Sequence, residues 1–298
     1  LQNLLDRRDV TVVSNPEFLR EGSAIHDCLN PERIVVGSND PAAADRLGDL
    51  FAATGAPLIR TDPATAEMIK YASNAFLATK LSFVNALSSV CEALGADVEG
   101  VLEGMGHDHR IGFDYLRPGP GWGGSCLPKD TKALAVISRA AGWQFSLLEE
   151  VIRSNEAHIE SLVAKVRDAV NGALVGRKVA VWGLTFKAGT DDRRGSPAIE
   201  IVLRLANEGA IVRVFDPTTI GRDVSELPAS VEVHHSAYSA CEETEVLVVL
   251  TEWDEFRSLD FMKVRELMET PRVVDGRNHL DFAVLRELGF SCVGLGRP

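Results

Sequence analysis

Apolar residues recur with helical spacing along two long stretches of the chain. Residues 62–95 open with Asp62-Pro63, a pair suited to cap and begin a helix, and they close on a glycine. A second long helix is expected over 145–171, and a shorter one near 97–105. Each long helix carries an apolar stripe, and we expect such exposed stripes to pair two copies of the chain into a dimer.

Beyond residue 171 the pattern changes to short apolar runs that alternate with helical segments. Residues 172–177 are interpreted as a hinge before this region. The expected strands are 178–184, 211–215, 245–250, 272–275 and 291–294. The clearest helix between them is 197–208. Such alternation is typical of a doubly wound parallel sheet with helices on both faces, and ligands bind at the carboxyl edge of such sheets.

The first sixty residues predict only the end of a similar sheet. The expected strands are 9–14, 33–37 and 57–60, and a helix is expected over 41–53. A dinucleotide-binding domain needs a Gly-x-Gly-x-x-Gly turn after its first strand, and no predicted strand here is followed by one. We therefore predict an α/β chain with three parts: a remnant of an N-terminal Rossmann domain, a central helical domain, and a C-terminal Rossmann-like domain, over 1–60, 61–171 and 172–298.

Composition limits the partners, the compartment and the kinds of site that this chain is expected to have. The 298 residues carry a formal net charge of −12, which argues against nucleic acid as a partner. Five cysteines stand singly without a Cys-x-x-Cys pair, so we expect reduced thiols, a cytoplasmic location and no metal site. The histidines at 107 and 109 have no third ligand at a familiar spacing and are interpreted as part of a loop. No apolar run is long enough to span a bilayer, and the first residues lack the design of a signal peptide.

The most distinctive stretch runs from Gly119 to Asp130 and reads Gly-Pro-Gly-Trp-Gly-Gly-Ser-Cys-Leu-Pro-Lys-Asp. Its glycines allow sharp turns and close approach to a ligand. Cys126 stands where a helix is expected to begin, so the helix dipole and the nearby Lys129 favour its thiolate. Asp130, one turn further on, is suited to hold or deprotonate a water molecule. The alternative is a glycine-rich loop with a buried and inert cysteine.

Two pairs of polar residues share a spacing of four. Glu17 and Glu21 lie on one face if Pro16 opens a helical turn, and the alternative is a solvated acidic face. Lys70 and Asn74 project together from an otherwise apolar helix and suggest a polar site, the alternative being a lysine that extends to solvent.

The first connection of the C-terminal sheet, residues 185–194, carries cations where a dinucleotide loop would have glycines. We interpret it as a diphosphate site with Lys187 and the later Arg277 as ligands, because the sheet edge binds ligands and guanidinium groups suit phosphate.

Several of these stretches together resemble the UDP-glucose/GDP-mannose dehydrogenase family, closest to its UDP-glucose 6-dehydrogenase branch. The cysteine loop fits the family pattern Gly-x-Gly-aromatic-Gly-Gly-Ser-Cys-x-Pro-Lys-Asp. The other matching segments, spread in order over nearly the whole chain, are 15–22, 67–74, 110–112 and 186–194. One departure is Gly195, where the family usually has glutamate.

The resemblance implies roles for residues at the matching positions. Those implied in catalysis are Cys126, Lys70, Asn74, Asp130 and Glu17. Those implied in binding the nucleotide sugar are Phe18, Leu19, Arg20, Glu21, Arg110, Tyr115, Leu116, Arg117, Gly119, Gly121, Gly123, Phe186, Lys187 and Arg277. Those implied on the cofactor side are Glu21, Lys129 and Arg194. By the same resemblance, Arg110 would reach a substrate across a subunit interface.

For the intact enzyme the resemblance implies a two-step NAD-dependent oxidation of UDP-glucose to UDP-glucuronate, in which Cys126 forms a thiohemiacetal and then a thioester. A homodimer or a larger homo-oligomer is implied as well. Because most of the NAD-binding half is expected to be absent, we expect this chain alone to form little or no NADH. The alternatives are a GDP-mannose 6-dehydrogenase, a non-catalytic nucleotide-sugar-binding and dimerisation fragment, and a thiol hydrolase, which would need a histidine close to Cys126.

Overall fold

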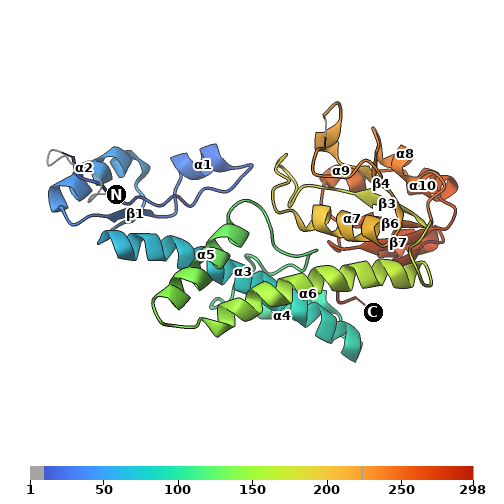
Figure 1. The fold of residues 1–298 in the computed structure, drawn as a ribbon, viewed down its shortest axis with the longest axis horizontal. Coiled ribbons are helices and arrows are strands. Elements are labelled where there is room, and N and C mark those ends of the chain that lie inside the picture. Colours follow the sequence, from blue (N-terminus) through green and yellow to red (C-terminus); the bar gives the residue numbers. More distant parts are fainter. Residues whose placement is uncertain (1–9, 223, 298) are drawn as a thin grey trace. The chain divides into compact units, whose positions relative to one another are not determined.

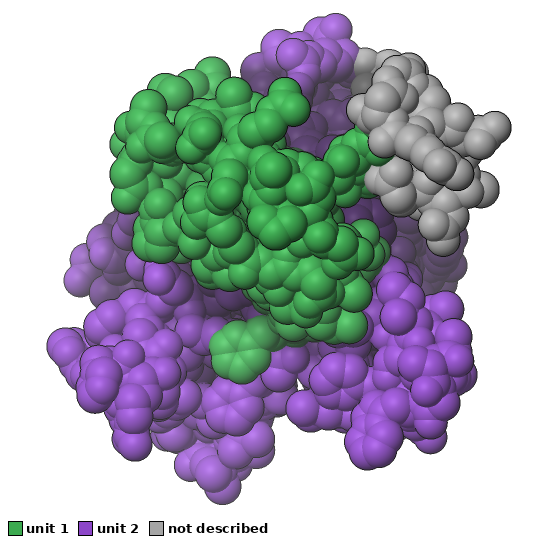
Figure 2. Space-filling view, turned by 90° about the vertical axis from the view of Figure 1, so that its left-hand side faces the viewer, with its two compact units in different colours: residues 1–76 green, residues 77–298 purple. Residues whose placement is uncertain are grey.

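The computed structural model describes residues 10–222 and 224–297 (Figure 1). The chain divides into two compact units, residues 1–76 and 77–298 (Figure 2). The junction falls within helix α3, Pro63–Leu94, so one continuous helix contributes to both units. This helix confirms the prediction for 62–95. Asp62 accepts a hydrogen bond from the Thr65 N–H at its start, as expected of a capping residue.

The described part of the first unit is built around one parallel crossover. Strands β1 and β2 pair in parallel, and helix α2 connects them. The Asp40 side chain caps α2 by accepting from the N–H groups of Ala42 and Ala43. The elements before α3 are α1 (Ala24–Leu29), β1 (Ile34–Gly37), α2 (Pro41–Phe51), the 3-10 turn η2 (Ala52–Thr54) and β2 (Leu58–Thr61).

One prediction for this unit is wrong, and the condition attached to another is not met. Residues 10–13 form no strand, and only Ser14 makes a single antiparallel bridge, with Gly37; residue 9 lies outside the described part. Residues 15–20 form no helical turn, so Glu17 and Glu21 do not share a helical face. Side chains compete for the backbone here: the Leu19 N–H donates to Glu17 Oε2 at 2.7 Å, which favours a non-helical path.

Three more helices follow α3 in the second unit: α4 (Val98–Gly106), α5 (Leu127–Ala140) and α6 (Ser146–Ala169). They confirm the helices predicted near 97–105 and over 145–171. Their termini match the sequence signals, since Asp97 caps α4 and Pro128 lies in the first turn of α5.

The remainder of the chain forms a six-stranded, all-parallel sheet in the order β5-β4-β3-β6-β7-β8. Figure 1 labels the four middle strands, β4, β3, β6 and β7. Numbered from its own first strand, this order is 3-2-1-4-5-6, which is that of dinucleotide-binding sheets. The strands are β3 (Lys178–Trp182), β4 (Ile211–Phe215), β5 (Glu232–Val233), β6 (Val246–Val249), β7 (Arg272–Asp275) and β8 (Ser291–Val293). The connecting helices are α7 (Pro197–Asn207), η3 (Pro217–Thr219), α8 (Ala237–Cys241), α9 (Asp254–Arg257), α10 (Phe261–Leu267) and α11 (Phe282–Glu287).

Side-chain alternation along the strands gives this sheet two separate cores. On one face Val179 and Val181 pack with apolar residues of α6 and α7, and on the other Ala180 and Trp182 pack with α8, α9, α10 and α11. The predicted fold class, α/β with long central helices and a C-terminal doubly wound parallel sheet, is confirmed. Sequence analysis missed only the two-residue edge strand β5 among the strands of this sheet.

Exposed apolar stripes were predicted on both long helices, but most of the stripe on α6 is covered. Most of the α6 stripe is buried, and Ile159, Leu162, Val163 and Val166 belong to the core on one face of the C-terminal sheet. The stripe therefore serves intramolecular packing and is not a free face. Helix α3 exposes several large apolar side chains, among them Phe76, Phe83, Val90 and Leu94, whereas α6 exposes Leu147 at its start.

Candidate functional site

The glycine loop is the segment from Gly119 to Cys126, and buried side chains of α3 and α6 hold its backbone. The Gly119 N–H donates to Asn85 Oδ1 at 3.0 Å, and the Gly119 carbonyl lies 2.8 Å from His158 Nε2. The Trp122 N–H donates to Asn155 Oδ1 at 2.9 Å, and Asn155 Nδ2 donates to the Trp122 carbonyl at 3.1 Å. The beginning of the loop is thus bound to two helices through side chains.

The other side of the loop approaches the carboxyl edge of the C-terminal sheet too closely for side chains. A Cβ atom added at Gly123 would lie 2.1 Å from the Gly195 carbonyl oxygen and 2.6 Å from Pro197 Cδ. One added at Gly119 would lie 2.8 Å from an Arg277 guanidinium nitrogen. Glycine is therefore required at 123, because the atom that a Cβ would meet there is a backbone oxygen, whereas at 119 it is the end of the flexible Arg277 side chain.

Cys126 occupies the predicted place at the start of α5, where it is the N-cap residue and half-buried. The Asp130 N–H donates to the Cys126 carbonyl at 3.0 Å, and Ser125 Oγ lies 3.6 Å from the thiol sulfur. The thiol thus lies at a helix N-terminus, where unpaired N–H groups stabilise negative charge.

Lys129 and Asp130 are ion-paired with each other, Nζ to Oδ1. The Asp130 side chain is buried, whereas that of Lys129 is largely exposed. The sequence predicted that the lysine charge acts on the thiol, and the structure pairs it with this carboxylate.

The predicted diphosphate ligands lie together at the carboxyl edge of the sheet. Arg277 Nη2 donates to the Phe186 carbonyl at 2.7 Å and Arg277 Nε to the Leu250 carbonyl at 2.9 Å. Arg277 Nε also lies 2.9 Å from a Glu252 carboxylate oxygen. Lys187 Nζ lies 5.6 Å from the centroid of the Phe186 ring. Arg277 therefore joins the glycine loop to the first and fourth strand connections of this domain, which places Gly119, Phe186 and Arg277 side by side.

Two buried carboxylates at the same edge were missed by sequence analysis. Asp216 follows β4 directly and accepts hydrogen bonds from the N–H groups of Leu184 and Thr185, at 2.7 and 3.2 Å. Asp275 ends β7, and burial raises its pKa although backbone N–H groups stabilise its charge. An aspartate at the end of the second strand binds ribose in dinucleotide-binding sheets. Here Asp216 is used internally, so this domain is not arranged as a dinucleotide site. The signal in the sequence was an aspartate at the end of the apolar runs that form β4 and β7.

In the first unit, Lys70 and Glu17 come together as a pair. Lys70 Nζ donates to the Glu17 carbonyl at 2.5 Å and lies 3.1 Å from Glu17 Oε1. Both cations near Phe18 face its ring, with Arg33 Cζ 3.8 Å and Lys70 Nζ 5.5 Å from the centroid. Asn74 lies one turn after Lys70 on α3 and is buried. Arg33 was not predicted, because nothing in the linear pattern relates it to Phe18.

The rest of the 18–21 segment is organised by a buried carboxylate. Arg20 forms a bidentate ion pair with Asp27, and the shorter distance is 2.6 Å. The hydrogen bonds from Arg20 hold the pKa of Asp27 well below its usual range. Leu19 is exposed and Glu21 is half-buried. This ion pair fixes the backbone that carries the predicted sugar-binding side chains.

The remaining predicted residues lie in exposed loops, except Leu116 and Gly121. Arg110 pairs with Asp108, at 2.5 Å, and Arg194 with Asp192, at 2.9 Å. Tyr115 and Arg117 are exposed, but Leu116 packs in the core between α3 and α4 with Val84 and Leu102 among its neighbours. The side chain of Leu116 is therefore committed to packing. Gly121 lies within the glycine loop, next to the Asn155 side chain.

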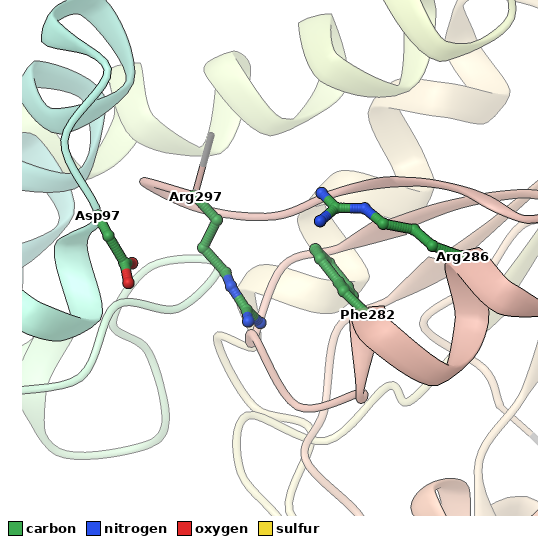
Figure 3. Close-up of a pocket in the computed structure, with 4 residues that line it drawn as sticks. All are labelled: Asp97, Phe282, Arg286 and Arg297. Carbon is green, nitrogen blue, oxygen red and sulfur yellow. The ribbon is translucent and has the colours of Figure 1, made fainter.

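A separate pocket of about 190 Å³ lies where α4 and α11 begin. Its lining residues are Asp97, Phe282, Arg286 and Arg297. Figure 3 shows the Arg297 guanidinium between Asp97 and the Phe282 ring, and its Cζ lies 4.6 Å from the ring centroid. None of these four residues was predicted to bind a ligand, and the pocket has no part in the glycine loop.

The described residues form neither a metal-binding cluster nor a membrane-spanning helix. Over 10–222 and 224–297 no group of three or more His, Cys, Asp or Glu side chains could hold a metal ion. Within the same ranges, every helix is too short or too polar to cross a membrane.

Three models of one protein family match this chain in order. Residues 2–54 match the NAD binding domain of the UDP-glucose/GDP-mannose dehydrogenase family, 64–157 its central domain and 180–282 its UDP binding domain. The glycine loop, Cys126 and all of α3 after Pro63 fall in the second match, and the predicted diphosphate ligands in the third.

Individual relatives agree with these matches. The UDP-glucose 6-dehydrogenases TuaD and YwqF of Bacillus subtilis are 44% and 43% identical over 98% of this chain, which covers 63% and 67% of their lengths. The structure of a UDP-glucose dehydrogenase from Pyrobaculum islandicum is 36% identical with a TM-score of 0.85, and the match covers 97% of this chain and 64% of that one. This chain therefore spans about two thirds of the length of these relatives, and it belongs to the UDP-glucose/GDP-mannose dehydrogenase family.

Proposed function

We propose that the protein to which this chain belongs is a UDP-glucose 6-dehydrogenase, which oxidises UDP-glucose to UDP-glucuronate in two NAD-dependent steps. One observation carries the proposal: the loop with Cys126 packs directly on the sheet edge that carries Phe186 and Arg277. The thiol that we propose as the nucleophile thus ends a loop whose glycines contact the carboxyl edge of the C-terminal sheet, where Arg277 lies. The names of the relatives support the choice of UDP-glucose.

Each oxidation removes two electrons from C6 of the sugar. After the first, the Cys126 thiol adds to the C6 aldehyde, so that a C–S bond forms and the carbonyl oxygen becomes an alkoxide or hydroxyl. After the second, the adduct is a thioester, and water displaces the sulfur to give the carboxylate and regenerate the thiol. In this proposal Lys70 stabilises the oxyanion, and Asp130 with Asn74 and Glu17 positions the water.

NAD supplies the electron acceptor in this chemistry when it is bound. Residues 2–54 match the NAD binding domain model, and the β1–α2–β2 crossover fits the sheet of such a domain. In the described ranges no strand is followed by the Gly-x-Gly-x-x-Gly turn that binds a pyrophosphate. On the cofactor side, we propose Glu21, Lys129 and Arg194 by the family resemblance alone.

The decisive test is calorimetric titration of the chain with UDP-glucose, UDP and GDP-mannose. We expect UDP-glucose and UDP to bind and GDP-mannose to bind at least tenfold more weakly. Preference for GDP-mannose would instead assign the chain to the other branch of the family. Absence of binding by all three would contradict the proposal.

The role of the thiol is tested separately. In the full-length enzyme, Cys126→Ser should abolish UDP-glucuronate formation, because an alkoxide cannot replace the thiolate as nucleophile and leaving group at neutral pH. Cys28→Ser, which removes an exposed thiol, is the control and should leave turnover unchanged. Full turnover by the Cys126 variant would refute covalent catalysis.

We also propose that the protein is a homo-oligomer in which α3 faces a second copy. Phe76, Phe83 and Val90 are exposed and recur every seven residues, which is the spacing of a helix–helix seam. Sedimentation velocity should show a dimer or larger species for the parent chain and a monomer for Phe83→Asp. Val136→Asp, at an exposed apolar position on α5, should leave the oligomer intact. A monomeric parent chain would contradict this assignment.

A further inference from the structure

Three polar side chains are buried in the long helices and point at the glycine loop instead of solvent. Asn85 lies on α3, and Asn155 and His158 lie on α6, each less than one-tenth exposed. Burying an amide or an imidazole is unfavourable unless each polar atom finds a partner, and here the partners are backbone groups of Gly119 and Trp122. We propose that Asn155, together with His158 and Asn85, is a positioning residue for the loop that carries Cys126. This inference rests on the proposed function only for its consequence in catalysis.

The loop depends on these side chains because it has no regular structure of its own. Among the described residues, Gly119 to Gly124 make no backbone–backbone hydrogen bond. Trp122 is bound by Asn155 through both its N–H and its carbonyl, so the amide imitates the neighbouring strand that a β-sheet would supply. Removal of Asn155 would leave two buried backbone groups without partners.

A second anchor holds the Trp122 side chain on the same helices. Trp122 Nε1 donates to Ser82 Oγ at 2.8 Å, and Ser82 Oγ in turn donates to the Val151 carbonyl at 3.2 Å. The indole packs in a small core with Val151, and Leu127 is packed against the same core. Cys126 directly precedes Leu127, so the thiol lies between two anchored residues, Trp122 and Leu127. The position of the sulfur is thereby tied to α3 and α6.

His158 belongs to this group as a hydrogen-bond donor and not as a base. Its Nε2 faces the Gly119 carbonyl, which only accepts, so Nε2 carries the proton. Burial lowers the pKa of His158, which keeps the ring neutral. The Nε2 of His158 is thus committed to the Gly119 carbonyl.

The test compares variants of α6 in the chain as it exists. Asn155→Leu removes the donor and the acceptor, and Asn155→Asp keeps the acceptor for the Trp122 N–H but loses the donor. His158→Leu removes the second clamp, and His158→Gln retains an N–H at a similar reach. Val163→Ala is the matched control, because Val163 is fully buried on the same helix but packs in the sheet core.

Two readouts report on the loop itself: amide exchange in a peptide covering 117–126, and alkylation of Cys126 by iodoacetamide relative to the exposed Cys28, both by mass spectrometry. We expect Asn155→Leu to accelerate loop exchange and relative alkylation at least tenfold, Asn155→Asp less, and Val163→Ala not at all. His158→Leu should resemble Asn155→Leu, with protection restored in His158→Gln, which a purely space-filling role would not produce.

Unchanged exchange and alkylation in a folded Asn155→Leu chain would overturn the inference. If that variant fails to fold, Asn155→Asp and the His158 pair decide it by the same two readouts. Titration with UDP separates this inference from the proposed function. If the parent chain binds no UDP but the variants show faster exchange and alkylation of the loop, the positioning role stands and the proposed function fails. If the parent chain binds UDP but the variants show unchanged exchange and alkylation, the positioning role is refuted.

Discussion

At the scale of single residues, neighbouring atoms leave no room for a side chain at position 123 of the glycine loop. Gly123 faces the Gly195 carbonyl so closely that Gly123→Ala must displace backbone on one side or the other. We expect this variant to lose about 2 kcal/mol or more of unfolding free energy, or to keep its stability with a displaced loop that binds UDP at least tenfold more weakly. Urea unfolding and calorimetry measure the two effects.

Gly104→Ala is the matched control for that substitution. Gly104 lies within α4 and has open space where a Cβ would be placed. Alanine there should raise stability by about 0.5–1 kcal/mol through helix propensity and leave UDP binding unchanged. A Gly123→Ala chain with the stability and UDP affinity of the parent would show that the loop is not packed on the sheet edge.

His158 should also give the stability a defined pH dependence. Because burial lowers its pKa in the folded chain, the unfolded chain binds a proton more readily. Its contribution is therefore complete above the ordinary histidine pKa of about 6.5 and declines as the pH falls below that value. Unfolding free energies at pH 7.5 and 5.5 should differ less in His158→Gln than in the parent chain. His234, whose pKa is lowered as well, contributes in the same direction and remains in both proteins. An identical difference in the two proteins would contradict this account.

At the scale of elements, the long helices show how far a hydrophobic pattern predicts a fold. The pattern located α3 and α6 to within one or two residues at each end, because period and capping are local properties. It did not show which stripe is covered. The α6 stripe packs on the C-terminal sheet, while Phe83 and Val90 of α3 remain exposed. Exposure depends on partners distant in the sequence, so periodicity alone cannot determine it.

The end of the chain is joined to α3 by a carboxylate. Glu92 Oε1 accepts from the Gly296 N–H at 2.7 Å, and Lys165 Nζ lies 2.6 Å from Glu92 Oε2. We expect Glu92→Gln to cost about 1.5–3 kcal/mol in urea unfolding, because it weakens charge-assisted bonds in a mostly covered site.

Glu99→Gln is the control for that prediction. Glu99 is half-exposed and lies 3.6 Å from Arg297, so the expected change is about 0.5 kcal/mol or less. Equal effects of the two substitutions would mean that the Glu92 contacts contribute no more than a surface ion pair.

At the scale of the whole molecule, the two units differ in the core that supports them. The described part of the first unit has a two-stranded sheet and a small core around Ile34, Val36 and Ala44. The second unit has a six-stranded sheet with a core on each face. Since stability grows with buried apolar area, β1 and β2 should lose amide protection at lower denaturant than β3 and β6. Hydrogen exchange in a urea series tests this, and simultaneous loss of protection in both sheets would contradict it.

The sequence by itself determined the element pattern, the family and the identity of the loop around Cys126, because helix periods, strand alternation, caps and short motifs are properties of neighbouring residues. Only the tertiary structure decided that Asn85, Asn155 and His158 hold this loop and that Lys129 pairs with Asp130. A polar residue on an apolar helix face signals a buried partner, but the partner is distant in sequence and is defined only when the chain is packed.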